Sequence, residues 1–269
     1  MKRLITGFFC LAFNGLLALF ISLPTLVNAQ TVCEALLPAS PSPREYLSHQ
    51  RYVWNTQDIE AAKQIMIEGS LNVSRTKASG RRFLVPESVA DSHIAKIAEE
   101  NFVRAVDYVF ANYRTLEIDQ KSAIELNRIL TERLVPENIR GQYNYRNRGN
   151  FVGQMDVFIP VSSDGFYLWL NMPQAKQMQM RDPVAFAEII HNSLVSLDSF
   201  PDGNGRLSRI FSDLVLIKNG LAPAFYTDMQ DYFYRGNARS TVPRETRQAY
   251  FREIVQRGQA ELRSRTSGN

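Results

Sequence analysis

A tight glycine-containing turn between two helical patterns constrains the fold of this chain more than any other feature. Residues 198–206 read Asp-Ser-Phe-Pro-Asp-Gly-Asn-Gly-Arg. Before them, apolar residues recur at helical spacing from the Asp182-Pro183 cap onward, at Phe186, Ile190 and Leu194. After them, residues 207–218 predict a second helix that ends at Asn219-Gly220. The turn therefore feeds directly into a helix N-terminus.

Most of the remaining chain also has the periodicity of amphipathic helices. The helices expected from spacing and end signals are 58–68, closed by Gly69, then 88–113, 119–134 and an arginine-rich 244–263. We expect the arginines of the last helix to form a solvated face, with a partner or membrane surface as the alternative. Residues 141–160 differ, because aromatic and β-branched residues alternate with Asn, Arg and Gly, which favours a β-hairpin or extended flap. The predicted fold class is mainly α, with a small β-hairpin flap.

The N-terminus has the features of a cleavable signal peptide over residues 1–29. Lys2 and Arg3 precede an apolar stretch from Leu4 to Leu26, and Val27-Asn28-Ala29 supplies the small residues that a signal peptidase requires. A retained membrane anchor is the alternative, because the stretch is long enough to span a bilayer. Cleavage implies a periplasmic or secreted protein with no stable membrane span.

Composition excludes two classes of protein. Hydrophobic residues make up 45% and charged residues 22% of the chain, which is typical of a globular protein and not of a disordered one. Loss of Lys2 and Arg3 with the leader would leave 29 basic against 27 acidic residues, a net charge of +2 instead of +4. That excess is too small to indicate binding to nucleic acid.

The residues of the turn are suited to holding an anion. Gly203, Asn204 and Gly205 accept positive φ values at little cost, and successive N–H groups in such a turn point inward. The following helix N-terminus adds its own N–H groups and dipole. Arg206 and Arg209, three residues apart, project from one side of that helix and can each grip a phosphate with two N–H groups.

Asp202 adds a carboxylate to this cationic turn. A carboxylate beside phosphates is repulsive unless a divalent cation bridges them, and Mg²⁺ is commonly held by one carboxylate together with substrate phosphates. A nucleoside di- or triphosphate with Mg²⁺ is the ligand that these residues favour. The alternative is an ordinary turn between helices with two solvated arginines.

This segment resembles the signature of the Fic (Fido) family, H-x-F-x-[D/E]-G-N-G-R-x-x-R. Seven positions match, and they are Phe200, Asp202, Gly203, Asn204, Gly205, Arg206 and Arg209. Residues 187–194 resemble the helix that leads into the family motif, and residues 214–220 resemble the helix end that follows it. Gly141-Gln142-Tyr143 and Val152-Gly153 resemble the family's flap, which clamps a segment of the target protein.

The resemblance implies a Fic-type helical bundle that binds ATP and Mg²⁺. Most members of the family transfer AMP from ATP to a Ser, Thr or Tyr hydroxyl of another protein, and for an exported member the expected target is a protein of a host or neighbouring cell. By analogy, Asp202 holds Mg²⁺ and Phe200 anchors the loop. Gly203, Asn204 and Gly205 bind the α-phosphate, while Arg206 and Arg209 bind the other phosphates. Val152 and Gly153 belong to the target-clamping flap.

The chain departs from the family at Asp198, which stands where the signature has its catalytic histidine. Asp198 would be the general base of an active enzyme, since a carboxylate can accept a proton from a hydroxyl within hydrogen-bond reach. Its side chain is shorter than histidine, and its charge faces the phosphates. The alternatives are a catalytically dead Fic-like pseudoenzyme, acting as a nucleotide- or protein-binding module, and a descendant that binds no nucleotide. His191, two helical turns earlier, is expected to be a buried structural histidine.

The expected domain organisation follows from these assignments. Residues 1–29 form the signal peptide, and residues 30–88 an N-terminal arm and helical extension. Residues 89–263 form the Fic-like domain, with its core motif at 187–220, and residues 264–269 are a tail.

Overall fold

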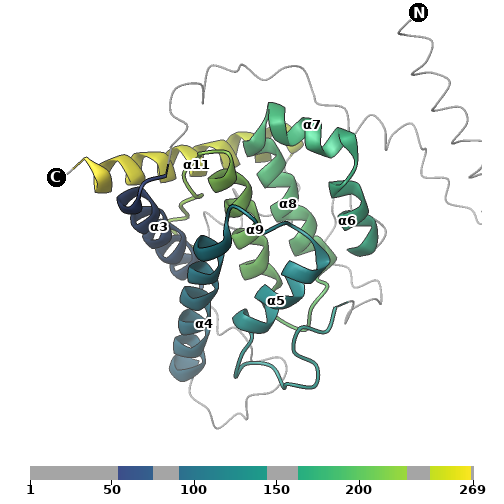
Figure 1. The fold of residues 1–269 in the computed structure, drawn as a ribbon. Helices are drawn as coiled ribbons and strands as arrows, with labels where there is room; N and C mark the ends of the chain where they lie inside the picture. Colours follow the sequence, from purple (N-terminus) through teal and green to yellow (C-terminus); the bar gives the residue numbers. More distant parts are fainter. Residues whose placement is uncertain (1–53, 75–90, 144–162, 229–242, 268–269) are drawn as a thin grey trace, which may run out of the picture. The chain divides into compact units, whose positions relative to one another are not determined.

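The structure is a computed structural model, and it describes residues 54–74, 91–143, 163–228 and 243–267. All of these lie in one compact unit, 45–269. The described residues contain eight helices and no strand (Figure 1): α3 (Thr56–Ser74), α4 (Asp91–Asn112), α5 (Gln120–Leu130), α6 (Ser163–Leu170), α7 (Pro173–Arg181), α8 (Pro183–Leu197), α9 (Asn204–Lys218) and α11 (Arg244–Thr266). The mainly helical fold class is confirmed.

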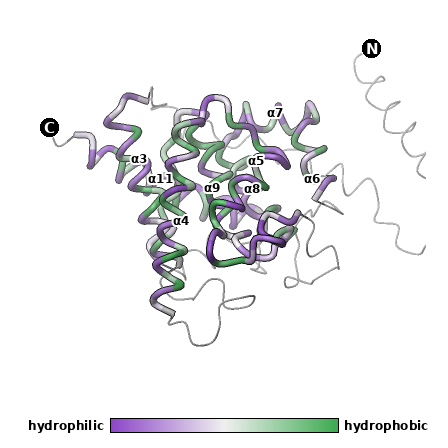
Figure 2. The backbone as a smooth tube through the Cα atoms, turned by 60° about the horizontal axis from the view of Figure 1, so that its bottom comes forward, coloured by the Kyte–Doolittle hydropathy of each residue, from purple (hydrophilic) through white to green (hydrophobic). Residues whose placement is uncertain are grey.

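Helices α8 and α9 form the central pair of the bundle (Figure 1). Helix α9 is buried along almost its whole length, since it also contacts α3, α4 and α5. Its buried hydroxyls bond to carbonyls of their own helix, as Ser208 Oγ does to Gly205 O at 2.8 Å and Ser212 Oγ to Arg209 O at 3.0 Å. Polar residues on α9 therefore enter the core without a large penalty. The outer helices are amphipathic, and Figure 2 shows hydrophilic and hydrophobic residues alternating along α4.

The helix ends that position the turn follow from short-range chemistry. Asp119 caps α5 by accepting from Ser122 N at 2.7 Å, and Asp182 caps α8 by accepting from Ala185 N at 3.0 Å. Pro183 occupies the first position of α8. Gly220, with φ 68°, follows Asn219, the C-terminal cap of α9. The Asp182-Pro183 start and the Asn219-Gly220 end were predicted from the sequence, whereas Asp119 was expected as the first residue of a helix to Leu134 and instead caps a helix that ends at Leu130.

Gly69 does not end its helix, as the sequence suggested, because α3 continues to Ser74. A Cβ atom at Gly69 would lie 3.3 Å from Tyr226 N and 3.4 Å from Ala224 O. The glycine therefore allows the 224–226 backbone to approach the side of α3 closely.

The arginines of α11 do not form the solvated face that was expected. Three of them form ion pairs with carboxylates on other helices: Arg247 with Glu188, Arg252 with Asp182, and Arg265 with Glu68. Arg265 grips Glu68 with two N–H groups, at 3.1 and 2.7 Å. Helix α11 thus ties α3 to α8, and its charges belong to the bundle.

Two expectations fall on residues outside the described ones. They are the signal peptide at 1–29 and the flap residues Val152 and Gly153. Among the helices that the structure does describe, none combines the length and the apolar character needed to span a bilayer.

Candidate functional site

The turn between α8 and α9 starts and ends on residues with left-handed backbone. Asp198, at the C-terminal cap of α8, has φ 44° and ψ 45°, and Gly203, at the N-terminal cap of α9, has φ 83° and ψ 0°. Asp tolerates this conformation better than most residues, at a cost of about 1 kcal/mol. The chain reverses between the two helices through residues 199–203. Asp198 and the N-terminus of α9 are thereby brought to the same end of the bundle.

Asn204 holds this turn together through its side-chain amide. Its Nδ2 donates to Asp198 Oδ1 at 2.7 Å and to Phe200 O at 2.8 Å, while its Oδ1 accepts from Phe200 N at 3.0 Å. Both donors and the acceptor of the amide are thus occupied within the turn. The Asn204 side chain thus shapes the loop, and an anion bound at this position would meet the backbone N–H groups of the helix N-terminus.

Phe200 anchors the turn on the side that faces the core. Its side chain is 1% exposed, and the ring of Tyr143 packs edge-on against it with a centroid separation of 5.8 Å. Next to it, the hydroxyls of Ser199 and Ser163 lie 2.5 Å apart and link the turn to α6. Burial raises the pKa of Tyr143 well above its usual value. The turn is therefore fixed on its inner side by packing and hydrogen bonds.

The C-terminal end of α5 supports the other side of the turn. Asn127 Nδ2 donates to the carbonyl oxygen of Asp202 at 2.8 Å. A Cβ atom at Gly203 would lie 3.0 Å from Thr131 Cγ2 and 3.1 Å from Asn127 Nδ2. Glycine is thus required at 203 both by its positive φ and by the close approach of α5.

Arg206 is buried and bonds to both the turn and α5. Its Nη1 donates to Leu130 O at 2.8 Å, and its Nη2 donates to Asp202 Oδ2 at 3.1 Å. Burial lowers the pKa of Arg206, the Asp202 carboxylate opposes that change, and Arg209 adds to it. The guanidinium is a cation held in place in a desolvated setting, where its attraction for an anion is stronger than in water.

Arg209 lies one turn further along α9 and is also buried, with 4% of its surface exposed. Its Nε and Nη2 both donate to Ser70 Oγ on α3, at 3.3 and 3.0 Å. Two neighbouring groups have pKa values that depend on this charge. Burial, with a smaller contribution from the charge of Arg209, lowers the pKa of His191 to about 3. Burial raises the pKa of Asp213 to about 8, against the opposing effects of the Ala224 N–H and Arg209.

His191 is the buried histidine that the sequence predicted. It is fully buried, and its ring lies near the rings of Tyr226 and Phe251, both at 6.4 Å between centroids. With a pKa near 3, the imidazole is neutral under ordinary conditions.

Asp202 fits the role of a ligand for a divalent cation. Its Oδ2 accepts a hydrogen bond from Arg206, and its Oδ1 has no hydrogen-bond partner among the described residues. The Asp202 side chain is 20% exposed to solvent. No cluster of three or more His, Cys, Asp or Glu suited to a metal occurs in the described part of the chain. A cation here would thus have one carboxylate from the protein and would need phosphate oxygens to complete its shell, as Mg²⁺ does with nucleotides.

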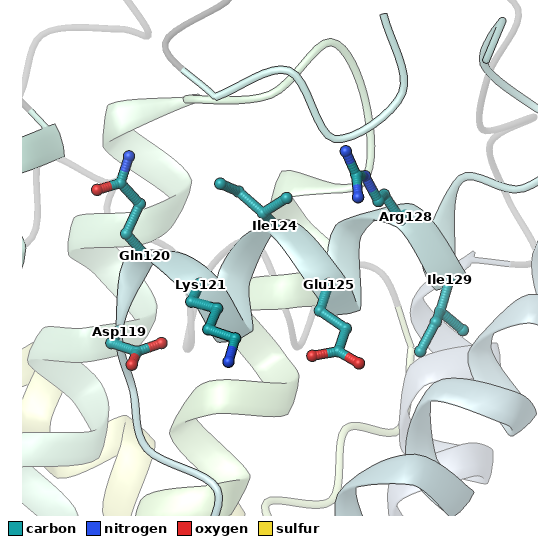
Figure 3. A pocket seen from close by; sticks show the side chains of 7 residues that line it. All are labelled: Asp119, Gln120, Lys121, Ile124, Glu125, Arg128 and Ile129. Atoms are coloured by element: carbon teal, nitrogen blue, oxygen red, sulfur yellow. The ribbon is translucent and has the colours of Figure 1, made fainter. Parts of the chain in front are cut away.

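A separate hollow of about 690 Å³ runs along the outer side of α5 (Figure 3). All seven residues that line it come from α5 and its cap: Asp119, Gln120, Lys121, Ile124, Glu125, Arg128 and Ile129. Gln120, Ile124 and Arg128 point to one side of the helix, and Lys121 and Glu125 to the other. None of them belongs to the turn between α8 and α9, so this hollow is separate from the turn and its arginines.

The structure thus brings together Asp198, Asp202, Gly203, Asn204, Arg206 and Arg209, together with Gly205 within the first turn of α9. Sequence reasoning missed three supporting residues, Asn127, Ser70 and Asp213. Asn127 could have been found, because it is a polar residue in the apolar stripe formed by Ala123, Leu126 and Leu130. Ser70 and Asp213 carry no such signal.

Residues 117–216 match the sequence model of the Fic/DOC family. Curated relatives include two proteins named protein adenylyltransferase Fic. The one from Drosophila virilis is 29% identical over 172 residues, which cover 61% of this chain and 33% of the relative. The one from Drosophila willistoni is 30% identical over 172 residues, covering 61% and 32%. The chain therefore spans about a third of the length of the curated relatives it matches.

Two solved structures share the fold. A Fic domain containing signaling protein from Bacteroides thetaiotaomicron has a TM-score of 0.55 at 15% identity, covering 89% of this chain and 96% of that one. Fic-1 from C. elegans has a TM-score of 0.54 at 15% identity, covering 88% and 70%. These likenesses concern the arrangement of the helices.

Proposed function

Because this chain belongs to the Fic/DOC family through residues 117–216, we propose that it binds Mg²⁺-ATP and transfers AMP to a Ser, Thr or Tyr hydroxyl of a target protein. The observation that carries the proposal is the joint placement of Arg206, the N-terminus of α9 and the Asp202 carboxylate at one turn. Arg206 supplies a buried positive charge, α9 supplies backbone N–H groups, and Asp202 Oδ1 is available to a cation. The matched curated relatives are adenylyltransferases by name.

In the proposed reaction, the target hydroxyl oxygen attacks the α-phosphorus of ATP. The bond between that phosphorus and the bridging oxygen of pyrophosphate breaks, and pyrophosphate leaves with the electron pair. The hydroxyl proton passes to the Asp198 carboxylate, so the products are the AMP-modified protein and pyrophosphate. Mg²⁺, when bound through Asp202, neutralises the charge that develops on the phosphate oxygens. The chain's own part is to hold the phosphates on the α9 N-terminus and Arg206.

Asp198 also favours a second candidate, a Fic-like pseudoenzyme that binds nucleotide or protein without turnover. Asn204 Nδ2 donates to Asp198 Oδ1 at 2.7 Å, and a carboxylate that accepts a hydrogen bond is a weaker base. General-base help is worth roughly 10²- to 10⁴-fold, so loss of the base would leave only slow transfer. The two candidates share the binding chemistry and differ in turnover alone.

Labelling with ATP that carries ³²P on its α-phosphorus separates the two. The protein is incubated with this ATP, Mg²⁺ and a host-cell lysate, beside Asp198→Ala and Asp198→His. We expect protein-bound label with the unmodified protein and its loss with Asp198→Ala. Label that appears only with Asp198→His would assign the pseudoenzyme, and no label with any variant would reject the transferase.

We also propose that the protein is exported, on the strength of the leader at residues 1–29. The periplasm has no useful supply of ATP, so an active transferase would work outside the producing cell, on a host or neighbouring-cell protein. Fractionation of expressing cells, followed by detection of the protein in the medium and of its N-terminal residue, tests this location.

A further inference from the structure

Asn127 of α5 forms a hydrogen bond with the backbone of the turn at residues 198–204, here called the anion loop. Its Nδ2 donates to Asp202 O at 2.8 Å, and the same nitrogen would lie 3.1 Å from a Cβ atom at Gly203. The Asn127 side chain is 1% exposed, so this bond is shielded from water.

The bond to Asp202 O fixes the direction of a neighbouring N–H group. The carbonyl of Asp202 and the N–H of Gly203 belong to one peptide unit, which is planar and trans. In a trans peptide these two groups point in opposite directions, so drawing the oxygen toward α5 turns the Gly203 N–H away from α5. With Gly203 at φ 83° and ψ 0°, that N–H stands next to those of the first turn of α9.

A second feature shows that Asn127 does not serve packing alone. Its Oδ1 is buried and has no hydrogen-bond partner among the described residues. An unpaired buried acceptor costs about 1–3 kcal/mol. The other members of this buried stripe include Ala123, Leu126 and Leu130, so a leucine at 127 would suit the helix packing without that cost.

We propose that Asn127 is a positioning residue for the anion loop. It orients the Asp202–Gly203 peptide, and through it both the Gly203 N–H that faces the phosphates and the Asp202 carboxylate that faces the cation. The effect on ligand binding rests on the proposed function, whereas the effect on loop geometry does not.

The chain contains a matched control in Asn101 on α4. Asn101 is also fully buried, its Nδ2 donates to Leu130 O at 3.4 Å and Glu132 O at 2.6 Å, and its Oδ1 likewise has no partner in the described part of the chain. Among the described residues its amide bonds to carbonyls at the end of α5 and not to residues 198–204, and it shares the more distant of these carbonyls, Leu130 O, with Arg206. Asn101→Leu and Asn127→Leu therefore remove equivalent amides, only one of which reaches the loop.

Amide hydrogen exchange of the nucleotide-free protein tests the geometry. We expect Asn127→Leu to speed exchange in residues 199–206 about tenfold relative to the unmodified protein, because one buried hydrogen bond no longer holds the peptide. Asn101→Leu should leave exchange in residues 199–204 unchanged, and Asn127→Gln, which keeps the donor, should restore part of the protection. Unchanged exchange in Asn127→Leu, or equal acceleration throughout α4 and α9, would overturn the proposal.

A second measurement tests the consequence for the ligand. Binding of a fluorescent ATP analogue is titrated with Mg²⁺, and Asn127→Leu should need about tenfold more Mg²⁺ for half-maximal binding. At saturating Mg²⁺ its affinity for the analogue should approach that of the unmodified protein, a pattern that general loss of fold does not give. An unmodified protein that binds no Mg²⁺-ATP would reject the proposed function, while the exchange experiment would still decide the role of Asn127.

Discussion

The Asn204 amide and the Asp198 carboxylate are joined by a hydrogen bond of 2.7 Å, which fixes a negative charge at the mouth of the anion loop. A histidine at position 198 would be neutral or positive, so the aspartate makes the loop more negative. Two unit charges about 4 Å apart in water interact with about 1 kcal/mol. The carboxylate that serves as the proposed base would therefore also weaken the proposed binding of ATP.

Asp198→Asn should bind Mg²⁺-ATP about fivefold more tightly, because it removes this charge and keeps the shape of the side chain. It should also lose AMP transfer, since an amide is no base. Calorimetric titration measures the affinity, and Glu99→Gln, an equal charge change at an exposed residue of α4, is the control. Weaker binding by Asp198→Asn would show that the carboxylate supports the ligand.

Arg206→Lys should lower the affinity for Mg²⁺-ATP at least tenfold. Lysine cannot bond Leu130 O and Asp202 Oδ2 together and still present a planar fork to phosphate. The free energy of unfolding should also fall by about 1–3 kcal/mol, because buried partners lose hydrogen bonds. Arg104→Lys, on an exposed arginine of α4, should change neither quantity in calorimetry or thermal unfolding. Unaltered ATP binding by Arg206→Lys would remove this arginine from the site.

Asp213→Asn should gain stability over the unmodified protein as the pH rises. The folded protein keeps the Asp213 proton up to about pH 8, whereas the unfolded chain loses it near 3.8. Between these values the unfolded state binds fewer protons, so the Asp213 contribution to the free energy of unfolding falls by at most about 1.4 kcal/mol per pH unit. Asparagine keeps the acceptor for Ala224 N, which Asp213 Oδ1 bonds at 2.9 Å, and does not titrate.

Urea unfolding at pH 5 and pH 7.5 measures this effect as the difference between Asp213→Asn and the unmodified protein. The contribution of His191 cancels in that difference, because both proteins contain it. Asp107→Asn, at an exposed carboxylate, should show no such trend. A difference that is the same at both pH values would mean that Asp213 is ionised in the fold.

Gly258→Ala should destabilise the bundle by about 3 kcal/mol. The added Cβ atom would lie 1.9 Å from the carbonyl oxygen of Pro223, so α11 or the 221–226 segment would have to shift. An ordinary helical glycine gives the opposite result, since alanine has the better helix propensity by about 1 kcal/mol. Thermal unfolding distinguishes the two signs, with Gln259→Ala on the same helix as a control.

The parts of the fold that the sequence predicted are those fixed by short-range chemistry. Asp182 and Gly220 set helix ends through contacts a few residues away, and the anion loop was identified from its amino-acid sequence alone. Helices α6 and α7 were missed, because α6 is a short run of mostly apolar residues and α7 is largely polar. Neither has a clear helical stripe.

Long-range contacts account for the rest. Gly69 looks like a helix stop until Ala224 and Tyr226 are known to lie beside it. The arginines of α11 look solvated until Glu68 and Glu188 are placed opposite them. Such partners lie far away in the sequence, and no local pattern identifies them.

The bond between Arg209 and Ser70 joins residues 139 positions apart. Ser70 lies outside the segment 117–216 that matches the family, so the second arginine of the loop depends on a helix that this segment does not contain. A fragment of residues 117–216 would contain every residue of the loop but would lack Ser70, which holds the Arg209 side chain. The loop would reach its final form late in folding, after α3 has packed against α9.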